Sequence, residues 1–142
     1  MTIATILEGK GHEVVTISDD ASIGEAVSLL AGRRIGAVPV LKGDTVAGIL
    51  SERDIINCLA RDGGCILDWP VSRLMSSPAL TVTRDCTCEE AMTLMTEKRI
   101  RHLPVEESGR LEGIVSIGDL VKHRIELAEQ DAEAMRSYIQ AT

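Results

Sequence analysis

The first half of the chain alternates short apolar, β-branched runs with stretches of helical spacing, and this pattern predicts mixed α and β structure. The run at 14–17 predicts a strand. Ser22 and Glu25 have the spacing of a capping box, so we expect a helix to begin there. Behind that cap, five apolar residues recur at helical spacing: Ile23, Ala26, Val27, Leu30 and Ala31. The segment therefore reads as a strand followed by an amphipathic helix.

Two more apolar runs follow, and they predict a β-hairpin. Residues 35–41 and 46–50 are rich in β-branched side chains, and a glycine-containing turn separates them. Pro39 lies inside the first run and suggests an edge strand or a strand end, because proline has no N–H to donate to a ladder. A Ser-x-x-Asp cap then precedes a helix expected over 52–61.

The same pattern of residues occurs a second time further along the chain. Residues 14–55 align without a gap on residues 79–120, at a constant offset of 65. The positions with identical residues in both copies are, in the first copy, Thr16, Asp20, Glu25, Ala26, Leu29, Arg34, Ile35, Pro39, Val40, Gly48, Ile49, Ser51 and Asp54. Such a repeat predicts two copies of one supersecondary unit related by a pseudo-twofold axis. We therefore predict a first domain over 1–62, a second over 63–124 and a helical tail over 125–142.

The connector and the tail lie outside the repeat. The connector at 63–78 is rich in glycine, serine and proline, and we expect one short helix in it near 71–75. Residues 121–140 contain no glycine or proline and are rich in Glu, Ala, Arg and Gln, which predicts a continued helix. Its apolar residues form a thin stripe suited to packing on the body or on a partner: Ile125, Ala128, Ala132, Met135 and Ile139.

Composition narrows the class of protein. The chain has 142 residues, no phenylalanine and a formal net charge of −7, so its core is aliphatic and we expect neither nucleic-acid nor anionic-membrane binding. No apolar run approaches the roughly 20 residues of a membrane span, and the N-terminus carries no signal-peptide pattern. These features predict a soluble, cytoplasmic protein. The cysteines lack zinc-ribbon spacing, so we expect reduced thiols and no metal site: Cys58, Cys65, Cys86 and Cys88.

One motif occurs at the same place in each copy. Residues 48–54 and 113–119 both read Gly, two aliphatic residues, Ser, two variable residues and Asp. Both copies also carry Arg-Ile-x-x-x-Pro-Val upstream, at 34–40 and 99–105. This combination resembles the signature of the CBS domain, and two such domains in tandem resemble a Bateman module. The chain looks most like the small stand-alone bacterial proteins that consist of a CBS pair and little else.

The resemblance implies a fold, a ligand and a way of acting. The expected fold class is α/β (α+β), with two tandem β-α-β-β-α domains packed about a pseudo-twofold axis. The expected ligand is an adenosine derivative such as AMP, ADP, ATP, NAD or S-adenosylmethionine. Members of the family act as sensors without catalysis, and they signal to a partner protein or to a fused enzyme or channel.

The Ser-x-x-Asp pairs have two interpretations. Ser51 with Asp54, and Ser116 with Asp119, are suited to an ordinary helix cap worth about 1 kcal/mol. In the family, the same aspartate accepts hydrogen bonds from the two hydroxyls of a ribose, while the serine and the free amides of the helix start hold sugar or phosphate. Both roles can coexist in one motif.

The resemblance also assigns residues to two clefts, each built across the repeats. The favoured cleft combines the first motif with residues of the second copy: Ile49, Ser51, Arg53, Asp54, Leu80, Ile100, Arg101 and His102. The second cleft combines the second motif with residues of the first copy and its leader: Lys10, Val15, Ile35, Gly36, Ala37, Ile114, Ser116 and Asp119. Aliphatic side chains would sandwich the adenine in either cleft.

The two clefts differ in charge, and this difference favours the Asp54 cleft for a nucleotide. Arg53, Arg101 and His102 are available there for phosphate, which arginine binds through a bidentate fork. The second cleft has Gly36 at the position of Arg101, so we expect weaker phosphate binding there. The alternative for Arg101 and His102 is a solvated pair at the start of a strand.

Three functions compete at this point. The first is a homodimeric regulatory module that binds an adenosine nucleotide and signals to an unknown protein. The second is an enzyme, because inosine monophosphate dehydrogenase and cystathionine β-synthase contain such pairs, but their chemistry lies in other domains that this chain lacks room for. The third is a structural or interaction protein with no physiological nucleotide. The expected dimer buries apolar residues of the second helix of each copy: Ile55, Ile56, Leu59, Leu120 and Val121. Whether it is head-to-head or head-to-tail is open.

Overall fold

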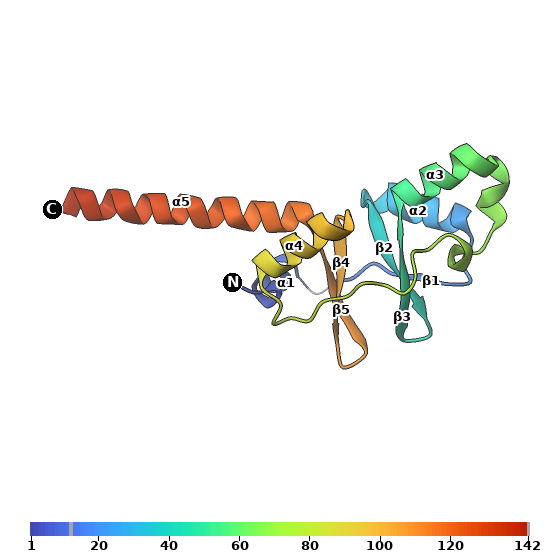
Figure 1. Ribbon diagram of the computed structural model, residues 1–142, viewed down its shortest axis with the longest axis horizontal. Coiled ribbons are helices and arrows are strands. Elements are labelled where there is room, and N and C mark those ends of the chain that lie inside the picture. The colour runs from blue at the N-terminus through green and yellow to red at the C-terminus, as the bar shows by residue number, and fades with distance from the viewer. Residues whose placement is uncertain (12, 142) are drawn as a thin grey trace.

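Two small β-sheets, one from each repeat, stand next to each other at the centre of the computed structural model, which describes residues 1–11 and 13–141 (Figure 1). The first sheet has the order β1 (Ile17–Ser18), β2 (Ala37–Lys42) and β3 (Thr45–Ser51), and the second pairs β4 (His102–Glu107) with β5 (Arg110–Ser116). Strand β3 contacts β5, so the two repeats meet through the strands that carry the shared motif. The expected mixed α/β fold with two tandem units is confirmed.

The helices follow the caps that the sequence predicts. Helix α2 (Ile23–Arg33) begins at a complete capping box in which the Glu25 N–H donates to Ser22 Oγ over 3.1 Å. Helix α3 (Glu52–Asp62) follows β3 directly, and α4 (Cys88–Lys98) begins where Thr87 accepts from the Glu90 N–H over 3.1 Å. The predicted start of α2 at Ser22 and the predicted range 52–61 for α3 are therefore correct to within a residue.

The first strand of each repeat is shorter than its apolar run predicts. In the first repeat only Ile17 and Ser18 pair, in parallel with Val40 and Leu41 of β2. In the second repeat the equivalent segment is reduced to one parallel bridge between Val82 and Val105. The order strand–helix–strand–strand–helix is kept, but the first strand contributes little to either sheet.

Pro39 lies in a central strand, because β2 pairs with β1 on one side and β3 on the other. The edge-strand interpretation of this proline is therefore wrong. The ring is tolerated since Pro39 pairs with Ile49 of β3, whereas β1 pairs only with Val40 and Leu41. The missing N–H falls just beyond the end of β1, where no ladder hydrogen bond is lost.

Helix α1 (Ile3–Lys10) was not predicted, and it packs against the second repeat rather than the first. Its apolar residues Ile3, Ile6 and Leu7 are buried in one cluster with Val115 and Leu120. The first repeat has a separate core built around α2, β2 and β3. The helix that precedes the first repeat therefore completes the core of the second repeat; we call each repeat with its core a lobe. The predicted domain boundaries at 62/63 and 124/125 stay predictions.

The connector runs back across the first sheet. It contains two 3-10 helices, η1 (Gly64–Asp68), which was not predicted, and η2 (Val71–Arg73), which lies where a short helix was expected. Ser76 and Ile49 then exchange both backbone hydrogen bonds, at 2.9 and 3.0 Å. The connector thus covers β3 next to the first Ser-x-x-Asp motif.

The glycine of each motif lets a segment from outside the repeats approach the sheet closely. A Cβ at Gly48 would lie 2.6 Å from the Ser76 carbonyl oxygen, and a Cβ at Gly113 would lie 2.7 Å from Leu7 Cδ2. The connector and α1 therefore occupy equivalent places on the two repeats. This equivalence was hidden in the sequence because the two segments have different residues and different secondary structure.

Helix α5 (Ile117–Ala141) is continuous from the second motif through the tail, as predicted. Its first turns pack against α4 and α1, and the rest extends away from the body along the long axis of the molecule (Figure 1). Within the two described ranges, none of the helices combines the length and the apolar character that a membrane crossing requires.

Candidate functional site

Both Ser-x-x-Asp motifs form reciprocal helix caps. In the first, the Asp54 N–H donates to Ser51 Oγ over 3.2 Å, and the Ser51 N–H donates to Asp54 Oδ2 over 3.1 Å. In the second, the corresponding distances between Asp119 and Ser116 are 3.1 and 2.9 Å. The capping interpretation is confirmed for both motifs. Each cap engages one carboxylate oxygen and holds the aspartate at the N-terminal end of its helix.

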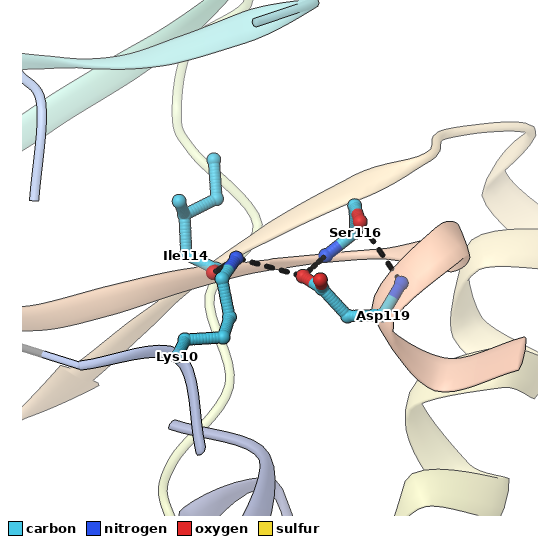
Figure 2. Close-up of polar contacts among 4 residues, drawn as sticks. All are labelled: Lys10, Ile114, Ser116 and Asp119. Atoms are coloured by element: carbon cyan, nitrogen blue, oxygen red, sulfur yellow. Dashed lines mark hydrogen bonds and ion pairs between the residues drawn. The ribbon is translucent and has the colours of Figure 1, made fainter. Parts of the chain in front are cut away.

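The two aspartates differ in what else they contact. Lys10, the last residue of α1, donates to Asp119 Oδ2 over 2.7 Å and to the Ile114 carbonyl oxygen over 2.8 Å (Figure 2). Burial alone would raise the pKa of Asp119, but the hydrogen bonds from Lys10 and from the Ser116 backbone outweigh it, and the pKa is lowered. Lys10 therefore neutralises the carboxylate of the second cleft from within the same chain.

Asp54 has no such partner. Of the lysine and arginine side chains in residues 1–11 and 13–141, none forms an ion pair with it. The residue equivalent to Lys10 at the offset of 65 is Met75, whose thioether packs on Gly48 instead. The structure therefore leaves an uncompensated carboxylate in the first motif and a compensated one in the second.

Three arginines gather on the other side of the first turn of α3. Arg53, Arg99 and Arg101 line a cavity of about 270 Å³, together with Ile100 and Ile117. Three of these residues, Arg53, Ile100 and Arg101, were expected in the favoured cleft, and they line one cavity. Their arrangement alone identifies no ligand. Arg99 was not expected in the cleft. Its position two residues before Arg101 is the feature of the sequence that could have indicated it.

Asp54 itself lines a neighbouring cavity of about 450 Å³. The other residues around it come from α3 and from the connector: Asn57, Cys58, Arg61, Asp62, Trp69, Arg73 and Leu74. The Arg73 guanidinium lies 3.5 Å from the centre of the Trp69 ring. Asp54 and the arginine cluster therefore lie on two sides of one helix start, not within one cavity.

His102 lies closer to residues of the second cleft than the family pattern suggests. A Cβ on Gly36 would be 3.5 Å from His102 Cε1 and 3.4 Å from Glu52 Oε1. Burial lowers the pKa of His102, and the charge of Lys10 lowers it further, while Asp119 acts in the opposite direction. The lowered pKa favours the neutral form of this imidazole.

The remaining candidates are divided between packing and open surface. Leu80 is exposed, Val15 packs against the first core, and Ala37 is buried at the start of β2. Ile35 and Gly36 line a largely apolar cavity of about 560 Å³ between α2 and α3. In the second cleft, hydrogen bonds join Lys10, Ile114, Ser116 and Asp119 into one group, as Figure 2 shows.

The four cysteines of the chain differ mainly in their burial. Cys58 and Cys88 are buried, Cys65 is exposed, and all four thiols are free. Burial raises the pKa values of Cys86 and Cys88, which keeps these thiols protonated at neutral pH. Within the described ranges, His, Cys, Asp and Glu side chains do not come together in any group of three that suits a metal ion.

Comparison with known proteins gives a consistent result. The model of the CBS domain matches residues 11–61 and 71–126. The CBS domain-containing protein YhcV of Bacillus subtilis is 34% identical over 116 residues, which cover 80% of each chain. The crystal structure of the CBS-domain containing protein ATU1752 from Agrobacterium tumefaciens superimposes with a TM-score of 0.84 at 42% identity, over 87% of this chain and 99% of that one.

More distant structures share the fold. They include CBSX2 in complex with AMP (TM-score 0.75, 24% identity, 89% and 98% coverage). They also include the CBS domain pair of MJ0100 in complex with 5-methylthioadenosine and S-adenosyl-L-methionine (TM-score 0.76, 22% identity, 86% and 94% coverage). The repeated motif, the paired lobes and these matches lead to one conclusion: the chain belongs to the CBS domain family and carries two CBS domains in tandem.

Proposed function

We propose that this chain is a regulatory module that binds an adenosine nucleotide at the first motif, beside Asp54. The observation that carries the proposal is the difference between the two aspartates. Asp119 is neutralised by Lys10, whereas Asp54 has only its cap. A carboxylate with a free oxygen at a surface cleft is suited to accept hydrogen bonds from two ribose hydroxyls.

The arginine cluster supports a phosphate on the same ligand. Arg53 and Asp54 are neighbours in the first turn of α3, and Arg53 lines a cavity with Arg99 and Arg101. A nucleotide that lies across this helix start would contact the carboxylate with its ribose and the arginines with its phosphate. The helix N-terminus adds free N–H groups and a positive dipole end, which also favour an anion.

Relatives of the same fold support the choice of ligand. CBSX2 was crystallised with AMP, and the MJ0100 pair with two adenosine derivatives. We therefore propose AMP, ATP, NAD or S-adenosylmethionine as the ligand class of this chain. We assign it no catalytic step, a cytoplasmic location, and a regulatory action on a protein that is not identified.

A thermal-shift panel tests the proposal. AMP, ATP, NAD and S-adenosylmethionine are compared at millimolar concentration with GMP and GTP. A ligand present at 100 times its dissociation constant stabilises the fold by about 2.7 kcal/mol, so a true ligand raises the melting temperature by several degrees. Equal shifts with adenine and guanine nucleotides, or no shift with any of them, would contradict the proposal.

The second candidate is an interaction module that binds no nucleotide. The Lys10–Asp119 ion pair favours it for the second cleft, because the lysine Nζ lies 2.7 Å from Oδ2 of Asp119, the oxygen that also accepts the cap, and offsets the charge that would attract ribose hydroxyls. If the first cleft failed the panel as well, the paired domains would act through their surfaces alone.

We also propose a homodimer. Of the five residues expected to face a partner, Ile55 and Leu120 are buried in the cores, whereas Ile56, Leu59 and Val121 are exposed on the helical face. If a second copy related by a twofold axis covered these three residues, the same face of both copies would be buried and the assembly would be closed. Light scattering that reports only a 15.3 kDa species at micromolar concentration would contradict it.

A further inference from the structure

The exposed part of α5 carries a seven-residue repeat. Apolar residues recur with alternating spacings of four and three: Val121, Ile125, Ala128, Ala132, Met135 and Ile139. This alternation is the pattern of a coiled-coil seam, in which such residues occupy the first and fourth positions of each heptad. A helix that merely rests on a globular body needs no such regular stripe.

Of the stripe residues, Ala128 also lines the cavity between α4 and α5, and the centre of the stripe points away from that cavity. The residues of α5 that line the cavity against α4 are Leu120, His123, Arg124, Leu127, Ala128 and Asp131. At about 100° per residue, the centre of the stripe lies roughly a quarter turn around the helix from the centre of this set. The exposed fractions of Val121, Ile125 and Met135 are 42%, 53% and 64%, so the seam is accessible at these three positions.

The charges beside the stripe match a second copy in parallel orientation. In a parallel pair, the residue just before the first position of a heptad meets the residue five places further along the other helix. The first positions here are Ile125 and Ala132. Arg124 then meets Glu129 of the partner subunit, and Asp131 meets Arg136 of the partner subunit, so both contacts join opposite charges. Arg124 lies 3.9 Å from Glu89 in its own chain, a surface contact that leaves the guanidinium accessible.

We propose that residues 121–139 pair with the same segment of a second copy as a parallel two-stranded coiled coil. Ala128 and Ala132 let the two helices approach closely at the middle of the seam. The seam begins at Val121, which also belongs to the exposed apolar face of the body, so tail pairing and body pairing share one twofold axis. That axis runs along α5, so the second domain of one copy faces the second domain of the other. The dimer is therefore head-to-head.

This inference does not depend on nucleotide binding, and disulfide crosslinking tests it directly. Ile125→Cys and Met135→Cys are made separately in a full-length Cys65→Ser background, which removes the exposed native thiol. A parallel seam brings each new cysteine next to its own copy, so both variants form covalent dimers under mild oxidation. Ser137→Cys, on the opposite side of the helix, is the matched control and crosslinks at least tenfold more slowly.

Two results would overturn the proposal. If neither seam variant crosslinks faster than Ser137→Cys, the tails do not pair. If only one of them does, or if only a mixture of the two does, the helices run antiparallel. A second measurement covers variants that oxidise poorly: Ala132→Glu weakens the dimer at least tenfold in sedimentation equilibrium, while Ser137→Glu changes it less than twofold. Equal effects of the two glutamates would also contradict the seam.

Discussion

At the scale of single residues, the site depends on what stands opposite each aspartate. The two motifs are nearly identical in backbone and cap geometry, with cap distances between 2.9 and 3.2 Å. What differs is Lys10 in one cleft and Met75 at the equivalent position of the other. In the proposed function, this side chain is the main difference between the two carboxylates.

Arg101 provides the test of the phosphate contact. Changing Arg101 to Ala removes a charge-assisted contact, so AMP affinity should fall by about 1.5–3 kcal/mol, while adenosine affinity should change little. Arg110→Ala, at an exposed position at the start of β5, is the matched control and should leave both affinities unchanged. Equal losses for AMP and adenosine would mean that Arg101 shapes the nucleoside pocket and holds no phosphate.

The ion pair of Lys10 with Asp119 makes stability depend on pH in a defined direction. Because the pKa of Asp119 is lowered in the folded state, its contribution is complete above the ordinary aspartate value near 3.8 and is lost as the pH falls below it. Lys10→Met should be less stable than the wild type at pH 7, and the difference should shrink toward pH 3. Urea midpoints at the two pH values measure it, and a difference that grows on acidification would contradict the assignment.

At the scale of elements, patterns that repeat were predictable and contacts between distant segments were not. The caps of α2, α3 and α4 and both hairpins follow from residues within a few positions of one another. Helix α1 was missed because its eight residues carry only a short apolar spacing, and its burial comes from the second repeat. The Lys10–Asp119 ion pair was missed for the same reason, since it joins residues more than a hundred positions apart.

The equivalent glycines of the two motifs give a prediction about these packed segments. Gly48→Ala would push a Cβ against a backbone oxygen of the connector at 2.6 Å, whereas Gly113→Ala would meet the flexible end of Leu7 at 2.7 Å. We expect Gly48→Ala to lower the free energy of unfolding by about 1–3 kcal/mol, and Gly113→Ala to cost less. Chemical denaturation that ranks them the other way would mean that the connector yields more easily than α1.

At the scale of the whole molecule, the exchange of segments couples the two lobes. The leader helix closes the second core, and the connector closes the first sheet, so each lobe is completed by a segment that also leads into the other domain. A ligand beside Asp54 would touch α3 and the loop before β4, which belong to different repeats. Binding there would fix the lobes relative to each other, and this is a route by which a small molecule could be sensed at a distant surface.

The measurement that tests the central claim most directly is calorimetric titration of AMP into Asp54→Asn and Asp119→Asn. Asparagine keeps an oxygen for the cap but loses the negative charge that would hold the ribose. The proposal predicts that Asp54→Asn weakens AMP binding by about 1.5–3 kcal/mol, a factor of roughly 10 to 150, while Asp119→Asn retains most of the wild-type affinity. Full loss of binding in Asp119→Asn, with Asp54→Asn unchanged, would contradict it.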